Sequence, residues 1–69
     1  MSKYLVIIEK AEANWAAYVP DLPGCVATGT GRDETLHRMR GAIAMHLEGI
    51  RADGGHAPEP SSTAEYVSI

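Results

Sequence analysis

The feature that most constrains the fold is an uninterrupted apolar run, Tyr4-Leu5-Val6-Ile7-Ile8, near the start of the chain. Adjacent β-branched and aromatic residues favour a strand, which we expect over Lys3–Glu9. Successive side chains of a strand point to opposite faces of its sheet, so both faces of this strand would be apolar. The run therefore predicts an interior strand that needs a covering layer on each side.

The chain is short for a fold that must cover both faces of a strand. Its 69 residues predict one domain, 1–69, with a small core. Cys25 is the single cysteine, so no internal disulfide can form, and we expect neither a metal nor a cofactor. Small cores without such staples are often completed by oligomerisation, so we expect a homo-oligomer, a dimer or tetramer, or a protein partner.

The composition narrows the class of partner. A formal net charge of −3 argues against a protein that follows nucleic-acid phosphates and favours a neutral ligand or a basic partner. The sequence also shows no leader peptide and no apolar run of membrane-spanning length, so we expect a cytoplasmic protein without a membrane segment.

Turn residues divide the first half of the chain into short strands. A second strand is expected over Trp15–Val19, and it ends at Pro20 because proline cannot donate to a sheet ladder. Pro23-Gly24 predicts a type II turn, since proline fixes the first torsion angle and glycine allows the positive one. A third strand is expected over Cys25–Thr30.

The second half of the chain predicts one helix and one strand. Asp33 is the expected N-cap of a helix that runs to about Asp53 and ends at Gly54-Gly55. Its apolar stripe consists of Leu36, Met39, Ile43, Leu47 and Ile50. The segment "TAEYVSI" at the end of the chain predicts a last strand.

The predicted fold class is therefore α+β, with the element order β-β-β-α-β. Two antiparallel hairpin connections come first, and a right-handed crossover then places the fourth strand parallel to the first. The expected spatial order of strands is 3-2-1-4, with one helix on one face. Since a single helix covers a single face, the other face is left for a partner.

The motifs around the second turn carry a family resemblance. "YVPDLPGCVATG", "AMHLEGIRADG" and "PEPSS" together resemble the HicB-like antitoxin family, over nearly the whole chain. The resemblance implies a partial ribonuclease-H-like fold that binds HicA, a small basic RNA-cleaving toxin, and blocks its active site. Complete members carry a C-terminal DNA-binding segment. We expect none within 1–69, and so no direct DNA binding by this chain alone.

Two groups of residues are candidates for contacts. The partner-binding candidates are Trp15, Tyr18, Pro20, Asp21, Leu22 and Pro23, with Leu22 expected at an exposed turn apex. Alternatively, the turn is a plain connector and the two aromatic residues pack within the monomer. The candidates for self-association are Gly41, Ala42, Met45, Gly49 and Ala52, which share the helix face away from the sheet.

Catalysis is not expected. A nuclease of this fold would need several carboxylates around Mg²⁺, whereas the nine acidic residues are scattered. The three histidines show no metal-ligand spacing, and Cys25 has no evident orienting partner. We expect a non-catalytic antitoxin. The alternative is an orphan HicB-like oligomeric module that binds a small ligand or RNA and has no toxin partner.

Overall fold

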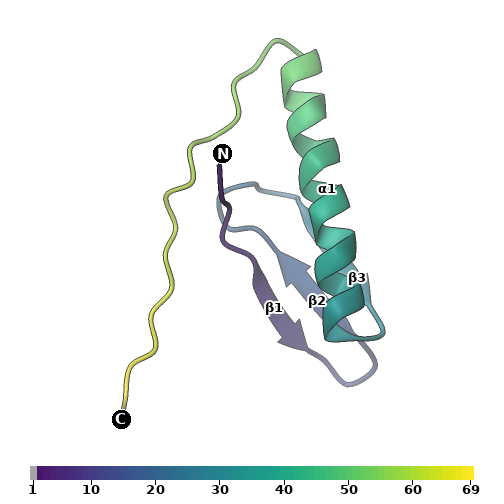
Figure 1. Cartoon of the computed structure of the whole chain (residues 1–69), viewed down its shortest axis with the longest axis vertical. Helices are drawn as coiled ribbons and strands as arrows, with labels where there is room; N and C mark the ends of the chain where they lie inside the picture. Colours follow the sequence, from purple (N-terminus) through teal and green to yellow (C-terminus); the bar gives the residue numbers. More distant parts are fainter. Residues whose placement is uncertain (1) are drawn as a thin grey trace.

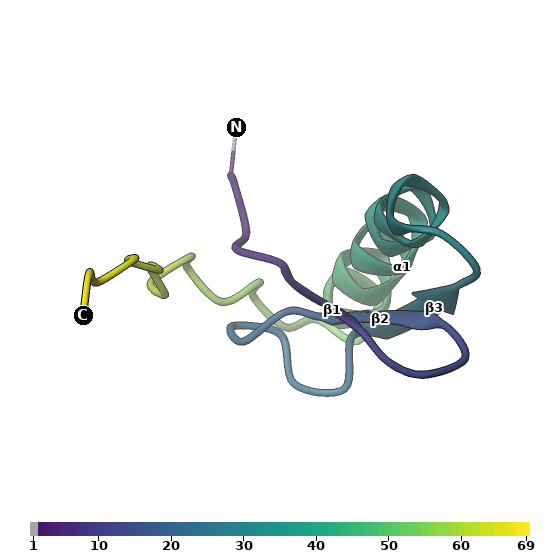
Figure 2. The ribbon, with the colours of Figure 1, turned by 90° about the horizontal axis from the view of Figure 1, so that it is seen from below.

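The computed structural model describes residues 2–69. It contains three strands and one helix, in the order β1 (Ile7–Lys10), β2 (Trp15–Tyr18), β3 (Val26–Gly29) and α1 (Arg32–Ala52). The strands form one antiparallel sheet in the order β1-β2-β3. The helix lies across one face of this sheet (Figures 1 and 2). The expected α+β class and the 3-2-1 part of the strand order are confirmed.

The first strand is shorter than predicted. The sequence predicts a strand over Lys3–Glu9, whereas β1 pairs with β2 only from Ile7, opposite Tyr18, to Lys10, opposite Trp15. The chain turns away after β2 at Pro20, which has no backbone N–H to offer. Residues 3–6 therefore run past the end of their neighbour.

The predicted fourth strand is not formed, which corrects the expected β-β-β-α-β order. No strand is assigned after α1 in the described residues, and the segment after the helix runs apart from the sheet in both views (Figures 1 and 2). Strand preference depends on packing against neighbours. The segment is instead held by polar contacts: Tyr4 Oη donates to the Pro58 carbonyl oxygen at 2.6 Å, and Ser61 and Ser62 bind Asp21.

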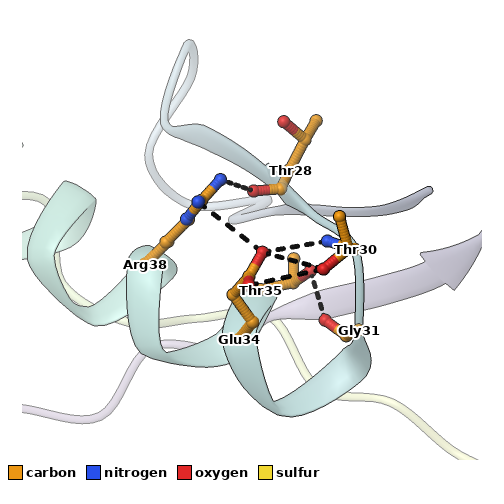
Figure 3. Close-up of polar contacts among 6 residues, drawn as sticks. All are labelled: Thr28, Thr30, Gly31, Glu34, Thr35 and Arg38. Atoms are coloured by element: carbon orange, nitrogen blue, oxygen red, sulfur yellow. Dashed lines mark hydrogen bonds and ion pairs between the residues drawn. The ribbon is translucent and has the colours of Figure 1, made fainter.

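The start of α1 is fixed by Gly31 rather than by the predicted N-cap Asp33. The Thr35 hydroxyl donates to the Gly31 carbonyl oxygen at 2.7 Å, and Glu34 Oε1 accepts the Thr30 N–H at 2.9 Å (Figure 3). Asp33 lies in the first helical turn, where a carboxylate interacts favourably with the helix dipole. The helix begins at Arg32, so Asp33 stands inside the first turn and not at the capping position where the sequence predicts it.

Arg38 links this helix start to β3. Its Nη1 donates to the Thr28 carbonyl oxygen at 3.1 Å, and its Nη2 lies 3.6 Å from Glu34 Oε1 (Figure 3). The Thr30 N–H and the Arg38 charge both lower the pKa of Glu34. The connection between β3 and α1 is thus held at both ends.

The helix ends as the sequence predicts. Gly54 adopts a φ of +80°, its N–H donates to the Arg51 carbonyl oxygen at 3.0 Å, and the Gly55 N–H donates to the Ile50 carbonyl oxygen at 2.9 Å. This pair of hydrogen bonds is a Schellman motif, in which glycine takes the left-handed position at no steric cost.

The core is small and lies between α1 and the sheet. Its buried apolar residues are Ala17, Val19, Leu22, Cys25 and Met39. Of the predicted stripe, Met39 is buried, and Ile43 and Leu47 pack against the core while partly exposed. The core thus fills one side of the sheet only.

Gly29 is required where β3 passes under the helix start. A Cβ at this position would lie 2.6 Å from Thr35 Oγ1 and 2.9 Å from Glu34 Oε1. We predict that Gly29→Ala lowers the free energy of unfolding by about 1–3 kcal/mol because of this overpacking. Chemical denaturation measures the change.

The matched control is Gly41→Ala, since a Cβ on Gly41 meets nothing within 4 Å. Alanine in a helix interior should stabilise the chain by about 0.5–1 kcal/mol. Equal effects at Gly29 and Gly41 would contradict the tight packing of β3 against α1.

Candidate partner-binding site

The loop between β2 and β3 is built from two consecutive turns. The Leu22 N–H donates to the Val19 carbonyl oxygen at 3.1 Å, and the Cys25 N–H donates to the Leu22 carbonyl oxygen at 3.0 Å. Proline stands second in each turn, and Gly24 has a φ of +82°. The second turn therefore has the type II geometry that Pro23-Gly24 predicts.

Leu22 does not lie at an exposed apex, which corrects the sequence-based expectation. It is 0% exposed and belongs to the core together with Val19 and Cys25. Because the turns follow each other directly, the residue shared by both is folded inward and anchors the loop. Pro20 and Pro23 remain exposed on its outside.

Asp21 binds the segment that follows the helix. Its Oδ2 accepts the Ser61 and Ser62 N–H groups at 2.9 and 3.0 Å, and its Oδ1 accepts the two hydroxyls at 3.1 and 2.7 Å. These bonds favour the ionised form, so the Ser62 and Ser61 backbone N–H groups lower the pKa of Asp21 from 3.8 to about 2. We call this arrangement the Asp21 clamp.

Sequence reasoning missed the clamp. The two partners stand 40 and 41 positions apart, and the only available signals were an aspartate in a rigid turn and a serine pair after Pro60. Neither signal indicates that the aspartate and the serine pair lie in contact. The carboxylate that was expected to face a partner is instead engaged within the molecule.

Trp15 and Tyr18 lie on opposite faces of the sheet, as predicted from their spacing. Side chains alternate along β2, so Trp15 shares the helix-covered face with buried Ala17, whereas Tyr18 points to the other face. Tyr18 is 43% exposed, and Trp15 is half-buried. Only Tyr18 is thus presented on the open side.

The open face carries an apolar row across all three strands. The register places Ile7 opposite Tyr18 and Tyr18 opposite Val26, and Val26 is 63% exposed. No helix or strand of residues 2–69 covers this face (Figure 2). We call Ile7, Tyr18 and Val26 the open-face row. The helix therefore covers one apolar face of the first strand, and the other apolar face has no covering layer in the described part of the chain.

The proposed self-association strip on α1 is partly as expected. Gly41, Met45, Gly49 and Ala52 are exposed, and Met45 is 74% exposed. Ala42 departs from this pattern because it is half-buried and packs against the core. It lies on the flank of α1 that turns toward the sheet.

The described residues also bear on three further features: a metal site, the cysteine thiol and a membrane-spanning helix. Within residues 2–69, no three His, Cys, Asp or Glu side chains lie together as a metal site would require. Cys25 is buried, and burial raises the pKa of its thiol. The one helix described, α1, is not apolar enough along its length to cross a membrane.

The Asp21 clamp predicts a pH dependence. The pKa is lower in the folded chain than its ordinary value of 3.8, so the stabilisation is complete above about pH 4 and is lost as the pH falls toward about 2. We expect amide hydrogen exchange at Ser61 and Ser62, measured by NMR and corrected for the intrinsic rate, to lose its protection over this range.

Asp21→Asn should remove the protection at every pH, and Asp53→Asn is the matched control because Asp53 stands outside the clamp. Protection that is unchanged at pH 2 would contradict the role of the carboxylate.

Comparison with known proteins places this geometry in a family. Residues 4–68 match the model of the "HicB_like antitoxin of bacterial toxin-antitoxin system". No solved structure matches the chain.

Three relatives illustrate the similarity. The chain is 31% identical to an uncharacterized 14.9 kDa protein of Haemophilus phage HP1 over 94% of its own length and 49% of the relative's. It is 40% identical to a UPF0150 protein of Helicobacter pylori, covering 68% and 65% of the two chains. It is 32% identical to a UPF0150 protein of Thermoplasma acidophilum, covering 97% and 96%.

The chain thus spans about half the length of the phage relative and nearly the whole length of the archaeal one. Since the family model covers all three strands, the Asp21 clamp and the helix, this chain belongs to the HicB-like antitoxin family.

Proposed function

We propose that this chain is a non-catalytic antitoxin that binds a small basic HicA-like toxin and covers its RNA-cleaving surface. The observation that carries the proposal is the open-face row, which leaves an apolar surface uncovered in a protein of an antitoxin family. An exposed tyrosine flanked by apolar neighbours is the kind of group that concentrates binding energy in an interface.

Charge supports the same partner. The net charge of −3 complements a basic protein and repels nucleic acid, so the acidic domain would compete with RNA for the toxin surface. Both molecules would then act in the cytoplasm, where the RNA is.

The geometry supports a particular set of contact residues for this interface. Tyr18 with Ile7 and Val26 forms the centre of the proposed interface, and Pro20 and Pro23 form a rigid edge beside it. Asp21 supports this surface through its clamp, and half-buried Trp15 lies on the other face of the same strand. Leu22 anchors the loop from inside the core.

The second candidate, a toxin-free oligomeric module for a small ligand or RNA, has one observation in its favour. An apolar groove of about 640 Å³ lies between the N-terminal segment and α1, and Lys3 and Arg40 are among its lining residues. An apolar groove with cationic edges suits a small amphipathic anion. The acidic charge of the whole chain disfavours RNA.

The test compares two charge-matched double variants in binding to a small basic protein encoded beside this one. We expect Tyr18→Lys/Val26→Lys to weaken the complex by about tenfold or more, because both residues are exposed on the proposed interface. Met45→Lys/Ala52→Lys adds the same charge on exposed helix positions and should bind normally. Calorimetry measures the affinity, and rescue of growth in co-expressing cells measures occlusion.

Equal loss in the two double variants would point to net charge rather than to the sheet face. Normal binding by Tyr18→Lys/Val26→Lys would exclude the open-face row as the interface. A wild-type chain that neither binds nor rescues would leave the toxin-free module.

A further inference from the structure

Residues 63–69 form an extended segment that carries apolar side chains into solvent. Tyr66, Val67 and Ile69 are 104%, 77% and 121% exposed, although the sequence there is typical of a strand. The segment is the yellow end of the chain, which lies apart from the sheet in both ribbon views (Figures 1 and 2). Its sequence favours a strand, yet the segment is exposed throughout and pairs with no strand of residues 2–69.

The described part of the same chain has a free sheet edge, on β1, to which another strand can be added. β1 pairs with β2 along one edge, and no strand of the described residues pairs with its other edge. Residues 3–6 continue this edge beyond the end of β2. An edge of unpaired backbone groups readily accepts an added strand.

An apolar hollow adjoins the acceptor edge. The groove of about 640 Å³ is lined by Tyr4 and Val6 from the N-terminal segment and by Leu36, Ile43 and Leu47 from α1. Met39 also lines the groove and belongs to the buried core. A strand laid on the edge would bring every second side chain to this groove.

The charges around the groove and on the segment are complementary. Lys3 and Arg40 line the groove, and Arg51 lines the hollow beside it. Within residues 2–69 the ion pairs are Arg32–Asp33 and Arg38–Glu34, so these three cations have no acidic partner. The unpacked segment carries Glu65 next to its apolar residues.

Two anchors fix the part of the chain that precedes this segment. The Asp21 clamp fixes Ser61 and Ser62, and Tyr4 holds Pro58. Beyond these anchors the chain continues outward (Figure 2). A second copy of the chain offers the same edge, the same groove and the same cations. Residues 63–69 of each copy can therefore occupy the edge and groove of the other copy.

We propose that residues 63–69 are exchanged between two copies, each segment adding to the β1 edge of the other copy and covering its groove. The resulting two-fold dimer uses one self-complementary contact twice. This interface differs from the helix strip of Gly41, Met45, Gly49 and Ala52. It also leaves the open-face row available to a toxin, so it stands independently of the proposed function.

The first experiment measures the mass of the full chain by light scattering over a range of concentrations. We expect a dimer for the wild type and an increase of about tenfold or more in the dimer dissociation constant for Tyr66→Asp/Val67→Asp. Both positions are exposed in the monomer, so the fold should be retained. The control Met45→Asp/Gly49→Asp adds the same charge to the helix strip and should leave the dimer intact.

The second experiment distinguishes exchange from simple contact. Lys3→Glu/Arg40→Glu alters two exposed groove residues and should disfavour the dimer by repelling Glu65. The groove variant keeps a normal segment, and the Tyr66→Asp/Val67→Asp variant keeps a normal groove. Mixing these two monomeric proteins should therefore give a heterodimer. In it, the normal segment of the groove variant binds the normal groove of the tail variant.

Three results would overturn the exchange: a wild-type chain that stays monomeric at high concentration, tail variants that dimerise normally, or dimers lost only in the helix-strip variant. The first would mean that the segment covers its own chain, and the third would make α1 the interface. Toxin binding, measured separately on the tail variant, tests the proposed function without depending on the dimer.

Discussion

The packing of α1 on one face of a three-stranded sheet is the constraint from which the rest of the structure follows. Met39 from the helix, Ala17 from β2 and Leu22 from the connecting loop form the centre of a small core. The helix start is tied to β3 through Arg38 and by the close approach of Thr35 to Gly29. One helix can cover only one face, so the fold leaves apolar surface open by construction.

Two distinct surfaces remain uncovered, and they suit different partners. The open-face row crosses all three strands and presents Tyr18, which fits a partner that lies flat on the sheet. The groove between the residues preceding β1 and α1 is largely apolar and includes Lys3 and Arg40, which fits an extended acidic segment. Separate surfaces let the proposed self-association and the proposed toxin contact exist in one assembly.

The Asp21 clamp links two segments that lie far apart in the sequence. It joins the loop after β2 to the segment after α1, and its four hydrogen bonds hold the carboxylate ionised well below its ordinary pKa. The loop is itself rigid because Leu22 is buried between its two turns. The direction in which residues 63–69 leave the molecule is therefore set by a polar contact and not by sheet pairing.

Local chemistry let the sequence alone determine the three strands, the Pro23-Gly24 turn, the helix and its glycine end, since each depends on neighbouring residues. Family membership was equally readable, because its motifs are short local runs in the loop after β2, at the end of α1 and just after the helix. The tertiary structure alone decided the burial of Leu22, the clamp on Asp21 and the absence of the fourth strand. These three depend on contacts between residues distant in the sequence. Local sequence patterns do not indicate which distant residues will meet or how strongly they will interact.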